Sequence, residues 1–298
     1  MISVRGQDAL WILVATAGFL VVTGVADDRF QMGITARAGC ELLAALAVIE
    51  LLDLRVVKLG DLLGLGIIRL PSDVSYIFTA IGIFGVINAF NMLDGLDGAL
   101  ASLVIATLVV FHLLTETPVG HVSLILGVSL LAFLISNLSL TRLIPKTFLG
   151  DAGSRLLGFI VVCLLLAAAS EQVGSPKIIN PVTTLYLVAL PLCDMTFTTL
   201  RRIINGRSPF LPDRTHVHHL LEELGFSKLR ALGIIVITSL AMNLLGLMLH
   251  RLGAPEHYQM AIFMILFSAY CFFVNQAWFL VEKLQAAGRS GPPPTTSR

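Results

Sequence analysis

Charged residues are scarce in this sequence. Asp, Glu, Lys and Arg make up 13% of its 298 residues, whereas hydrophobic residues make up 56%. Because a soluble domain carries about 25% charged residues, this composition excludes a soluble domain with a single anchor and predicts a polytopic membrane protein. The formal net charge is only +1, which provides no general attraction to nucleic acid. No nucleic-acid partner is therefore expected.

Cysteine is also sparse, and no phosphate-binding loop of the Walker type is present. The absence of a Walker loop argues against transport driven by nucleotide hydrolysis. The absence of C-x-x-C pairs excludes a disulfide framework and the usual zinc spacings. We expect the four cysteines to be small buried hydrophobes, since each stands alone in an apolar run: Cys40, Cys163, Cys193 and Cys271.

Apolar runs long enough to cross a bilayer, about 17–25 residues in a helix, recur along the whole chain. No soluble domain lies between them, and Glu41, Glu50 and Asp53 interrupt only the second. We predict an all-α, polytopic membrane bundle that forms a single domain over residues 1–285, with a disordered cytoplasmic tail over 286–298. The nine predicted transmembrane helices cover residues 9–26, 36–54, 74–91, 98–115, 119–136, 154–170, 181–198, 231–250 and 257–281.

Basic residues are divided unequally between the two predicted sides. The connections after odd-numbered runs carry most of the 20 Lys and Arg residues, so the positive-inside rule makes them cytoplasmic and places the amino end outside. Residues 1–26 also resemble a secretory signal. Removal of this segment would leave every later motif outside the cell, against the charge bias, and we expect a retained helix.

The segment NAFNMLDGLDGALA, residues 88–101, places Asn91, Asp94 and Asp97 three residues apart between two apolar runs. On a helix these side chains share one face. Carboxylates at the mouth of a membrane helix are costly unless they bind something, and neighbouring carboxylates repel unless a cation or a donor lies between them. The alternative is a solvated loop with helix-capping aspartates.

Two further acidic motifs lie on the same predicted side. In DDRF, one of Asp27 and Asp28 is a candidate metal ligand or base and the other a partner for Arg29, unless the segment is a solvated turn. In FLGDAGS, residues 148–154, the N–H groups that begin the next helix form an anion site. Asp151 suits a Mg²⁺ ion between helix and phosphate, and an N-cap, which Ser154 also fits, is the alternative.

The longest polar connection is NGRSPFLPDRTHVHHLLEELG, residues 205–225. Pro209 and Pro212 stiffen it, and Gly225 ends a short amphipathic helix. Arginine and histidine without cysteine suit phosphate oxygens better than zinc, and His216 and His218 do not share a helix face. A solvated basic loop is the alternative to a donor-rich cluster made of Arg207, Arg214, His216, His218 and His219.

Two polar residues near the inner ends of predicted spans face the same region. Asn137 lies at the inner end of the fifth run. Asp194 either forms a hydrogen bond between two helices, which we favour, or holds a residue of the site in position. Acids and an Arg/His loop on one membrane face fit a metal diphosphate. Phosphoryl transfer depends mainly on positioning and charge neutralisation, and its membrane setting suggests a lipid phosphate as one substrate.

Four motifs in this order, DDRF, NAFNMLDGLDG, FLGDAGS and SPFLPDRTHVHHLL, resemble the polyprenyl-phosphate N-acetylhexosamine-1-phosphate transferases. The histidine loop is similar to that of the bacterial undecaprenyl-phosphate N-acetylglucosamine-1-phosphate transferases that start O-antigen chains. The resemblance implies a multi-pass enzyme of the bacterial inner membrane, with its active site cytoplasmic and the bilayer as its setting. It transfers sugar 1-phosphate from UDP-GlcNAc or a related UDP-sugar to undecaprenyl phosphate and releases UMP. Mg²⁺ is the implied cofactor, with Mn²⁺ as an alternative, and a homodimer is allowed.

The same resemblance assigns roles by motif. Asp27 and Asp28 match the pair near the lipid phosphate, and Asp27 is the candidate that deprotonates or orients this phosphate. Asp94 and Asp97 match residues at the nucleotide pocket. These four aspartates form the expected catalytic set. Asp151 matches the principal metal ligand and Asn91 a second one. Phe148 stacks on uracil, and the remaining substrate-binding residues are Asn137, Arg214, His216, His218 and His219.

The chain departs from the family at its start, because it lacks the first two helices and begins at what looks like the third. We therefore expect a shortened or mis-started reading frame that lacks part of the acceptor site. A catalytically dead homologue is one alternative. An ion-coupled transporter is another, and it predicts ionisable residues near the middle of the bilayer.

Overall fold

The computed structural model describes residues 6–115, 118–170, 178–209 and 214–289. The described chain is almost entirely helical, in the order α1 (Gly6–Phe30), α2 (Ile34–Leu52), β1 (Lys58–Gly60), β2 (Ile68–Arg69), α3 (Ser72–Leu93), α4 (Ala99–Thr115), α5 (Pro118–Asn137), α6 (Gly150–Ala169), α7 (Pro181–Leu187), α8 (Ala189–Ile204), α9 (Val217–Glu223), α10 (Lys228–Arg251) and α11 (Glu256–Arg289). The two strands pair as an antiparallel hairpin. The predicted all-α class is confirmed apart from this hairpin.

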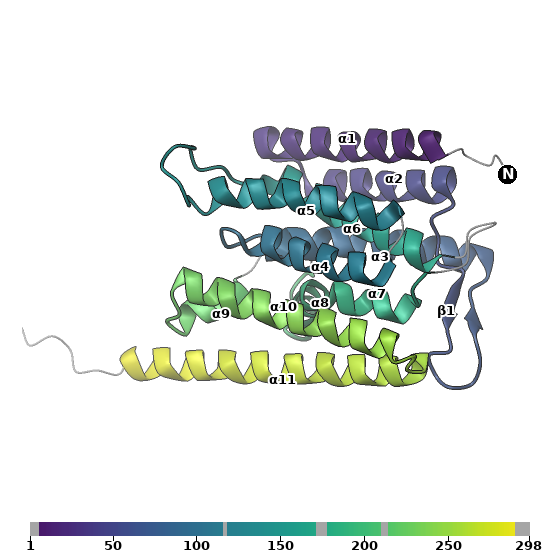
Figure 1. The fold of residues 1–298 in the computed structure, drawn as a ribbon. Coiled ribbons are helices and arrows are strands. Elements are labelled where there is room, and N and C mark those ends of the chain that lie inside the picture. The colour runs from purple at the N-terminus through teal and green to yellow at the C-terminus, as the bar shows by residue number, and fades with distance from the viewer. Residues whose placement is uncertain (1–5, 116–117, 171–177, 210–213, 290–298) are drawn as a thin grey trace, which may run out of the picture.

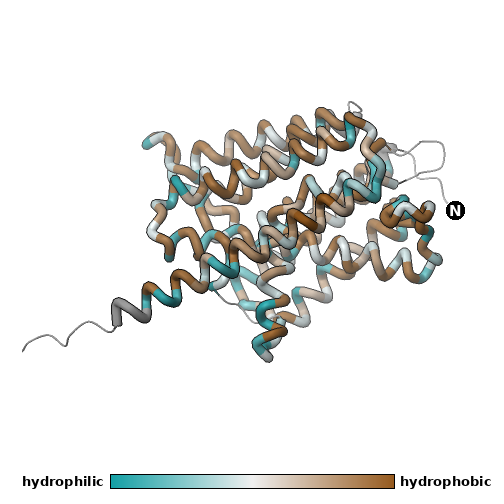
Figure 2. Tube along the Cα trace, turned by 90° about the horizontal axis from the view of Figure 1, so that it is seen from below, coloured by the Kyte–Doolittle hydropathy of each residue, from teal (hydrophilic) through white to brown (hydrophobic). Residues whose placement is uncertain are grey.

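The long helices lie side by side and alternate in direction (Figure 1). The hairpin and the start of α1 occupy one end of the bundle, and the connection between α5 and α6 lies at the other with α9. Hydrophobic residues dominate the helices, and hydrophilic residues gather near their ends (Figure 2). Three helix ends meet at the end of the bundle opposite the hairpin, namely the carboxyl ends of α1 and α3 and the amino end of α6 (Figure 1).

Five helices in the described residues are long and apolar enough to cross a membrane, namely most of α1 and α11, and α3, α6 and α10. Helices α7 and α8 form a sixth candidate, a span broken at Val188 and bent by 82°. Each of the nine predicted runs falls on helix, but nine spans are not confirmed. Helix α2 carries the charged residues Arg37, Glu41 and Glu50. Helix α4 and the described apolar part of α5 are shorter than 18 residues, and the run 181–198 contains the break at Val188.

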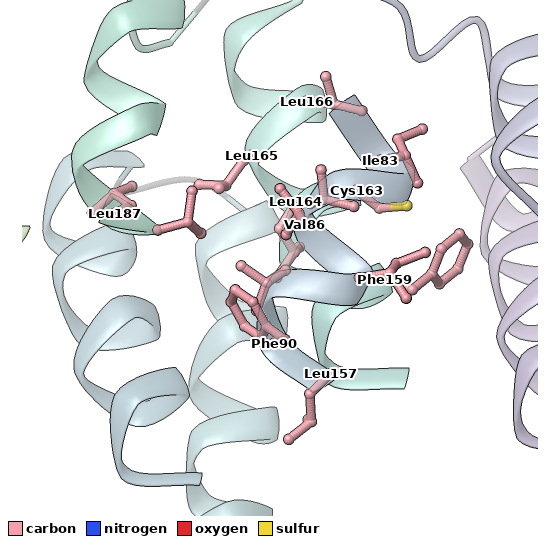
Figure 3. Close-up of a cluster of buried hydrophobic side chains, with 14 of the residues drawn as sticks. Ile83, Val86, Phe90, Leu157, Phe159, Cys163, Leu164, Leu165, Leu166 and Leu187 are labelled. Atoms are coloured by element: carbon pink, nitrogen blue, oxygen red, sulfur yellow. The ribbon is translucent and has the colours of Figure 1, made fainter. Parts of the chain in front are cut away.

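The core is built around α3 and α6. Gly158 of α6 lies against α3 so closely that a Cβ there would be 2.9 Å from the Ile87 Cα. Around this crossing, side chains of both helices and Leu187 of α7 form a buried cluster that includes Phe90, Phe159 and Cys163 (Figure 3). All four cysteines are free, as predicted, and two of them, Cys163 and Cys193, are buried.

The α1–α6 contact is equally tight and places one acidic motif beside another. A Cβ added at Gly24 would overlap the backbone of Ala152. Residue 24 lies one turn before DDRF, and residue 152 lies within FLGDAGS. The small residues at this crossing therefore bring Asp27 and Asp151 into one neighbourhood.

The first residues of the predicted tail belong to the last helix. Helix α11 continues to Arg289, so residues 286–289 are helical, and residues 290–298 lie outside the described part of the chain.

Candidate active site

A pocket of about 320 Å³ opens where α3, α5 and α6 meet at the end of the bundle opposite the hairpin. Its walls come from the end of α3, the loop that joins α3 to α4, the end of α5 and the turn into α6. Six of the twelve predicted site residues line it: Asn91, Asp94, Asp97, Asn137, Phe148 and Asp151. Two motifs that are far apart in the sequence, residues 88–101 and 148–154, thus share one cavity with the end of α5.

The acidic loop lies outside the helix on which the predicted spacing relied. Helix α3 ends at Leu93, where Asp94 becomes the C-cap, and Asp97 lies in the following turn. The turn is possible because Gly98 adopts a φ of +77°, which L side chains avoid. Asp94 and Asp97 still reach the same pocket as Asn91, but through the shape of the loop and not through a shared helix face.

Asp94 lies among negative charges. Burial, together with the charges of Asp151 and Asp97, raises the pKa of its carboxyl to about 7. Lys146 pairs with Asp97, with 2.6 Å between Nζ and Oδ2, and its ammonium also lies 5.1 Å from the centre of the Phe148 ring. Asp94 is therefore the carboxylate whose charge a bound cation would most relieve.

Asn137 holds the acidic loop in place. Its Oδ1 accepts the Gly98 backbone N–H at 2.6 Å, and its Nδ2 donates to the Thr147 carbonyl at 2.8 Å. Ser136 beside it donates to the Pro145 carbonyl at 2.6 Å. The end of α5 thus joins the acidic loop to the segment that carries Phe148. The geometry gives Asn137 a positioning function, although the sequence predicts substrate binding.

The turn into α6 follows the prediction closely. Gly150 begins the helix with a φ of +66°, and Asp151 lies in its first turn with a half-exposed carboxylate. Leu149 is the N-cap, so the alternative of a Ser154 cap is wrong. The Ser154 hydroxyl is buried instead, where it accepts the Asn91 amide at 2.8 Å and donates to the Asp151 carbonyl at 3.2 Å.

Asp27 and Asp151 are joined by an arginine that lies inside the protein. Nη2 of Arg155, a residue only 4% exposed, donates to Asp27 Oδ2 at 2.6 Å and to Asp151 Oδ2 at 2.7 Å. Arg155 Nε lies 3.4 Å from Glu41 Oε1, and Arg37 donates to Asp27 Oδ2 at 3.3 Å. The predicted pairing with Arg29 is therefore replaced for Asp27 by two arginines from α2 and α6.

Asp28 is exposed and lies at the turn into α6. A Cβ built on Gly150 would be 3.3 Å from Asp28 Oδ2. Phe148, on the same turn, is 73% exposed. Asp28 and Phe148 therefore stand at the open side of the site, whereas Asp27 is buried beneath it.

The histidine segment reaches the acidic loop through His218. A Cβ added at Gly95 would overlap the His218 imidazole, so the ring lies against the loop backbone. The rings of His216 and His218 are parallel with centres 5.9 Å apart, and His219 lies 4.1 Å from His218. As predicted, a short helix follows and Gly225 closes it with a φ of +84°. The four motifs therefore converge.

The remaining members of the loop are less engaged. Arg214 is exposed, and His219 Nδ1 lies 3.6 Å from Glu222 Oε2. Residues 210–213, which include Pro212, lie outside the described part of the chain. Within the described ranges, no three His, Cys, Asp or Glu side chains are close enough to hold an ion by themselves.

The pocket fits a hard divalent cation by donor chemistry. Its donors are carboxylate and amide oxygens, of which those of Asp94, Asp97 and Asp151 repel one another. Mg²⁺ typically takes one or two carboxylates and fills its other positions with water and substrate phosphates. The spacing of the acids around an open cavity suits that mode of binding.

Comparison with known proteins decides the family. Residues 10–169 match the sequence model of glycosyl transferase family 4. An undecaprenyl-phosphate alpha-N-acetylglucosaminyl 1-phosphate transferase of Yersinia pestis is 34% identical over 273 residues, which are 90% of this chain and 73% of the relative. The chain belongs to this family. A protein of the same name from Haemophilus influenzae is 35% identical over 87% of this chain and 73% of its own length. Another, from Escherichia coli K12, is 30% identical over 93% of this chain and 76% of its own length. The resemblance drawn from the four motifs is thus confirmed.

Several residues of this family 4 site are not visible in its motifs. Arg155 follows Asp151 by one helical turn, which is a signal for an ion pair. Glu41 interrupts a predicted span, and its Oε2 accepts the Asn88 amide at 2.6 Å. A charge inside an apolar run is costly unless it is paired, so its position alone indicated a buried partner.

Gly95→Ala is expected to reduce the turnover of the family 4 activity about 100-fold, because the new methyl group displaces either the acidic loop or His218 by about 1 Å. Initial rates of product formation measure the effect. Gly18→Ala is the matched control, since a Cβ there meets nothing within 4 Å. Activity of Gly95→Ala within twofold of wild type would show that the contact is unimportant.

Acid should destabilise the protein through His218. Burial lowers the pKa of its imidazole to about 4, with a further contribution from His219 and His216. Since the unfolded chain takes up this proton near pH 6.5, the free energy of unfolding falls as the pH drops from 6.5 towards 4, by about 2–3 kcal/mol at most. Denaturant titrations at pH 7.5 and 4.5 should show a smaller loss for His218→Gln than for wild type. Equal losses in both proteins would refute this.

Proposed function

We propose that this chain transfers N-acetylglucosamine 1-phosphate, or a close N-acetylhexosamine 1-phosphate, from a UDP-sugar to undecaprenyl phosphate and releases UMP. The observation that carries this proposal is the shared pocket, in which Asp94 lies between Asp97 and Asp151 with its pKa raised to about 7. Such a site favours a cation and a diphosphate. The names of the relatives supply the sugar and the lipid.

In the proposed reaction, an oxygen of the lipid phosphate attacks the β-phosphorus of the UDP-sugar. The bond between this phosphorus and the oxygen that bridges to the α-phosphorus breaks, and UMP leaves with the bridging oxygen. Asp28 is exposed beside Gly150 at the open side of the site, whereas Asp27 is engaged by Arg155 and Arg37. We therefore assign the binding of the acceptor phosphate to Asp28. Asp27 has a structural function, in which it holds the guanidinium groups of Arg155 and Arg37 beside Asp151.

In this proposal, the pocket and the histidine segment bind the UDP-sugar donor. Phe148 offers an exposed ring for the uracil, and His216, His218, His219 and Arg214 supply donors for the diphosphate. Asp151 and Asn91 would hold Mg²⁺, or Mn²⁺ in its place, which would neutralise charge on the diphosphate as it develops. Lys146 keeps Asp97 at the pocket wall.

The position of the acids distinguishes a transferase from an ion-coupled transporter. A transporter needs ionisable residues midway along its spans. Asp27, Asp94, Asp97 and Asp151 instead lie around one pocket and its border at one end of the bundle. We propose that this end faces the cytoplasm of the bacterial inner membrane and that the product starts an envelope polysaccharide such as an O-antigen.

Purified protein in lipid nanodiscs tests this function. With UDP-GlcNAc, undecaprenyl phosphate and Mg²⁺, we expect lipid-linked N-acetylglucosamine and one UMP per lipid product, both abolished by EDTA. UDP-GalNAc in a parallel reaction measures the sugar preference. Release of UDP, or no lipid product in the presence of both substrates, would contradict the proposal.

A further inference from the structure

Asp194 of α8 is buried at the place where the histidine segment meets the bundle. It is 1% exposed, and its carboxylate has three protein partners. Oδ2 lies 2.7 Å from His216 Nδ1, while Oδ1 accepts the Val217 backbone N–H at 2.9 Å and the Tyr270 hydroxyl at 2.8 Å. A buried carboxylate with this many donors is fully engaged, and one residue connects α8, α9 and α11.

The contact with Val217 is a helix cap provided from another helix. His216 is the N-cap of α9, and its own side chain makes no capping hydrogen bond. The Oδ1 of Asp194 accepts the first free N–H of that helix instead. The start of α9 is thereby fixed to α8, six residues after the break at Val188.

The contact with His216 sets the state of the ring. Since a carboxylate can only accept, Nδ1 of His216 carries the proton and Nε2 is the ring nitrogen that can take a further partner. The parallel ring of His218 lies next to it, and His218 contacts the backbone at Gly95. A chain of contacts therefore runs from Asp194 through both rings to the acidic loop.

We propose that Asp194 is a positioning residue, which fixes the tautomer and orientation of His216 so that Nε2 is presented to the diphosphate of the donor. The inference rests on the proposed function and adds a residue outside the four motifs. The sequence favoured a helix–helix hydrogen bond for Asp194, and the Tyr270 contact is one. The bond to His216 gives the same carboxylate a second task.

A double-mutant cycle tests whether Asp194 acts through His216. Asp194→Asn is expected to lower kcat/KM about 100-fold, because an amide can present N–H to Nδ1 and favour the other tautomer. In a His216→Gln background the same change should cost less than about threefold. Asp53→Asn, an Asp to Asn change at the hairpin end of the bundle, is the matched control and should be neutral. Additive losses would overturn the proposal.

A spectroscopic measurement separates this proposal from the function itself. The chain has seven histidines, and solid-state NMR of ¹⁵N-histidine-labelled protein reports the tautomer of each. We expect an Nδ1–H signal that disappears in His216→Gln and shifts in Asp194→Asn. A His216 signal with the proton on Nε2, or one unchanged in Asp194→Asn, would overturn the assignment. An inactive wild-type protein with the expected signals would count against the transferase and not against this contact.

Discussion

Asp151→Asn is expected to lower turnover at least about 1,000-fold with little loss of stability. The carboxylate loses its charge at the point where it would bind Mg²⁺, whereas the amide keeps its size. The fold should survive because Arg155 retains Asp27 and Glu41 as partners. Product formation at saturating substrates and thermal unfolding in nanodiscs measure the two effects.

Asp73→Asn serves as its control. Asp73 is exposed in the first turn of α3, at the hairpin end of the bundle, and the change should alter neither quantity. Near-normal turnover of Asp151→Asn in about 10 mM Mg²⁺, well above a typical requirement, would remove Asp151 from the metal site.

Arg155→Met is expected to lower the free energy of unfolding by about 3–5 kcal/mol, since it leaves the buried Glu41 without its cation and leaves Asp27 with Arg37 alone. Asp27 is 6% exposed and Glu41 is 3% exposed, so water cannot replace the guanidinium fully. Activity should fall as well, because the same side chain joins Asp27 to Asp151. Denaturant unfolding in micelles measures the loss.

Two further variants make this result interpretable. Arg230→Met, at an exposed position in α10, controls for the loss of an arginine and should change stability by less than about 0.5 kcal/mol. Adding Glu41→Gln to Arg155→Met should recover part of the loss, because it removes one uncompensated charge. A destabilisation below 1 kcal/mol for Arg155→Met alone would show that the network is not a structural centre of the site.

Local patterns were sufficient to find the four motifs and to put Asp151 next to the start of a helix, although α6 begins at Gly150 and not at the predicted residue 154. They also predicted the short helix after His216 and its end at Gly225. These features depend on neighbouring residues, such as glycines that allow a positive φ. The predicted end of the third span at residue 91 lies close to the end of α3 at Leu93, and only the shared helical face of Asn91, Asp94 and Asp97 was wrong. The bend at Val188 falls inside the predicted span 181–198, and Pro191 in the first turn of α8 was a local signal for a break that the long apolar run outweighed.

Features that depend on distant partners were not predictable. Arg155 of α6 and Glu41 of α2 are far apart in the sequence, and they come together because both helices pack on α1 and α3. The bonds of Asp194 to His216 and of Asn137 to the Gly98 N–H were not predictable for the same reason, since these partners lie on other elements.

The convergence of the four motifs on one phosphoryl-transfer site is tested most directly by following the β-phosphate of the donor. Purified protein receives UDP-GlcNAc labelled with ³²P at the β-phosphorus, together with undecaprenyl phosphate and Mg²⁺. We predict that the label moves with the sugar into the lipid fraction and that UMP is released unlabelled. Label that stays in the aqueous fraction as UDP, while sugar reaches the lipid, would contradict sugar-1-phosphate transfer at this site.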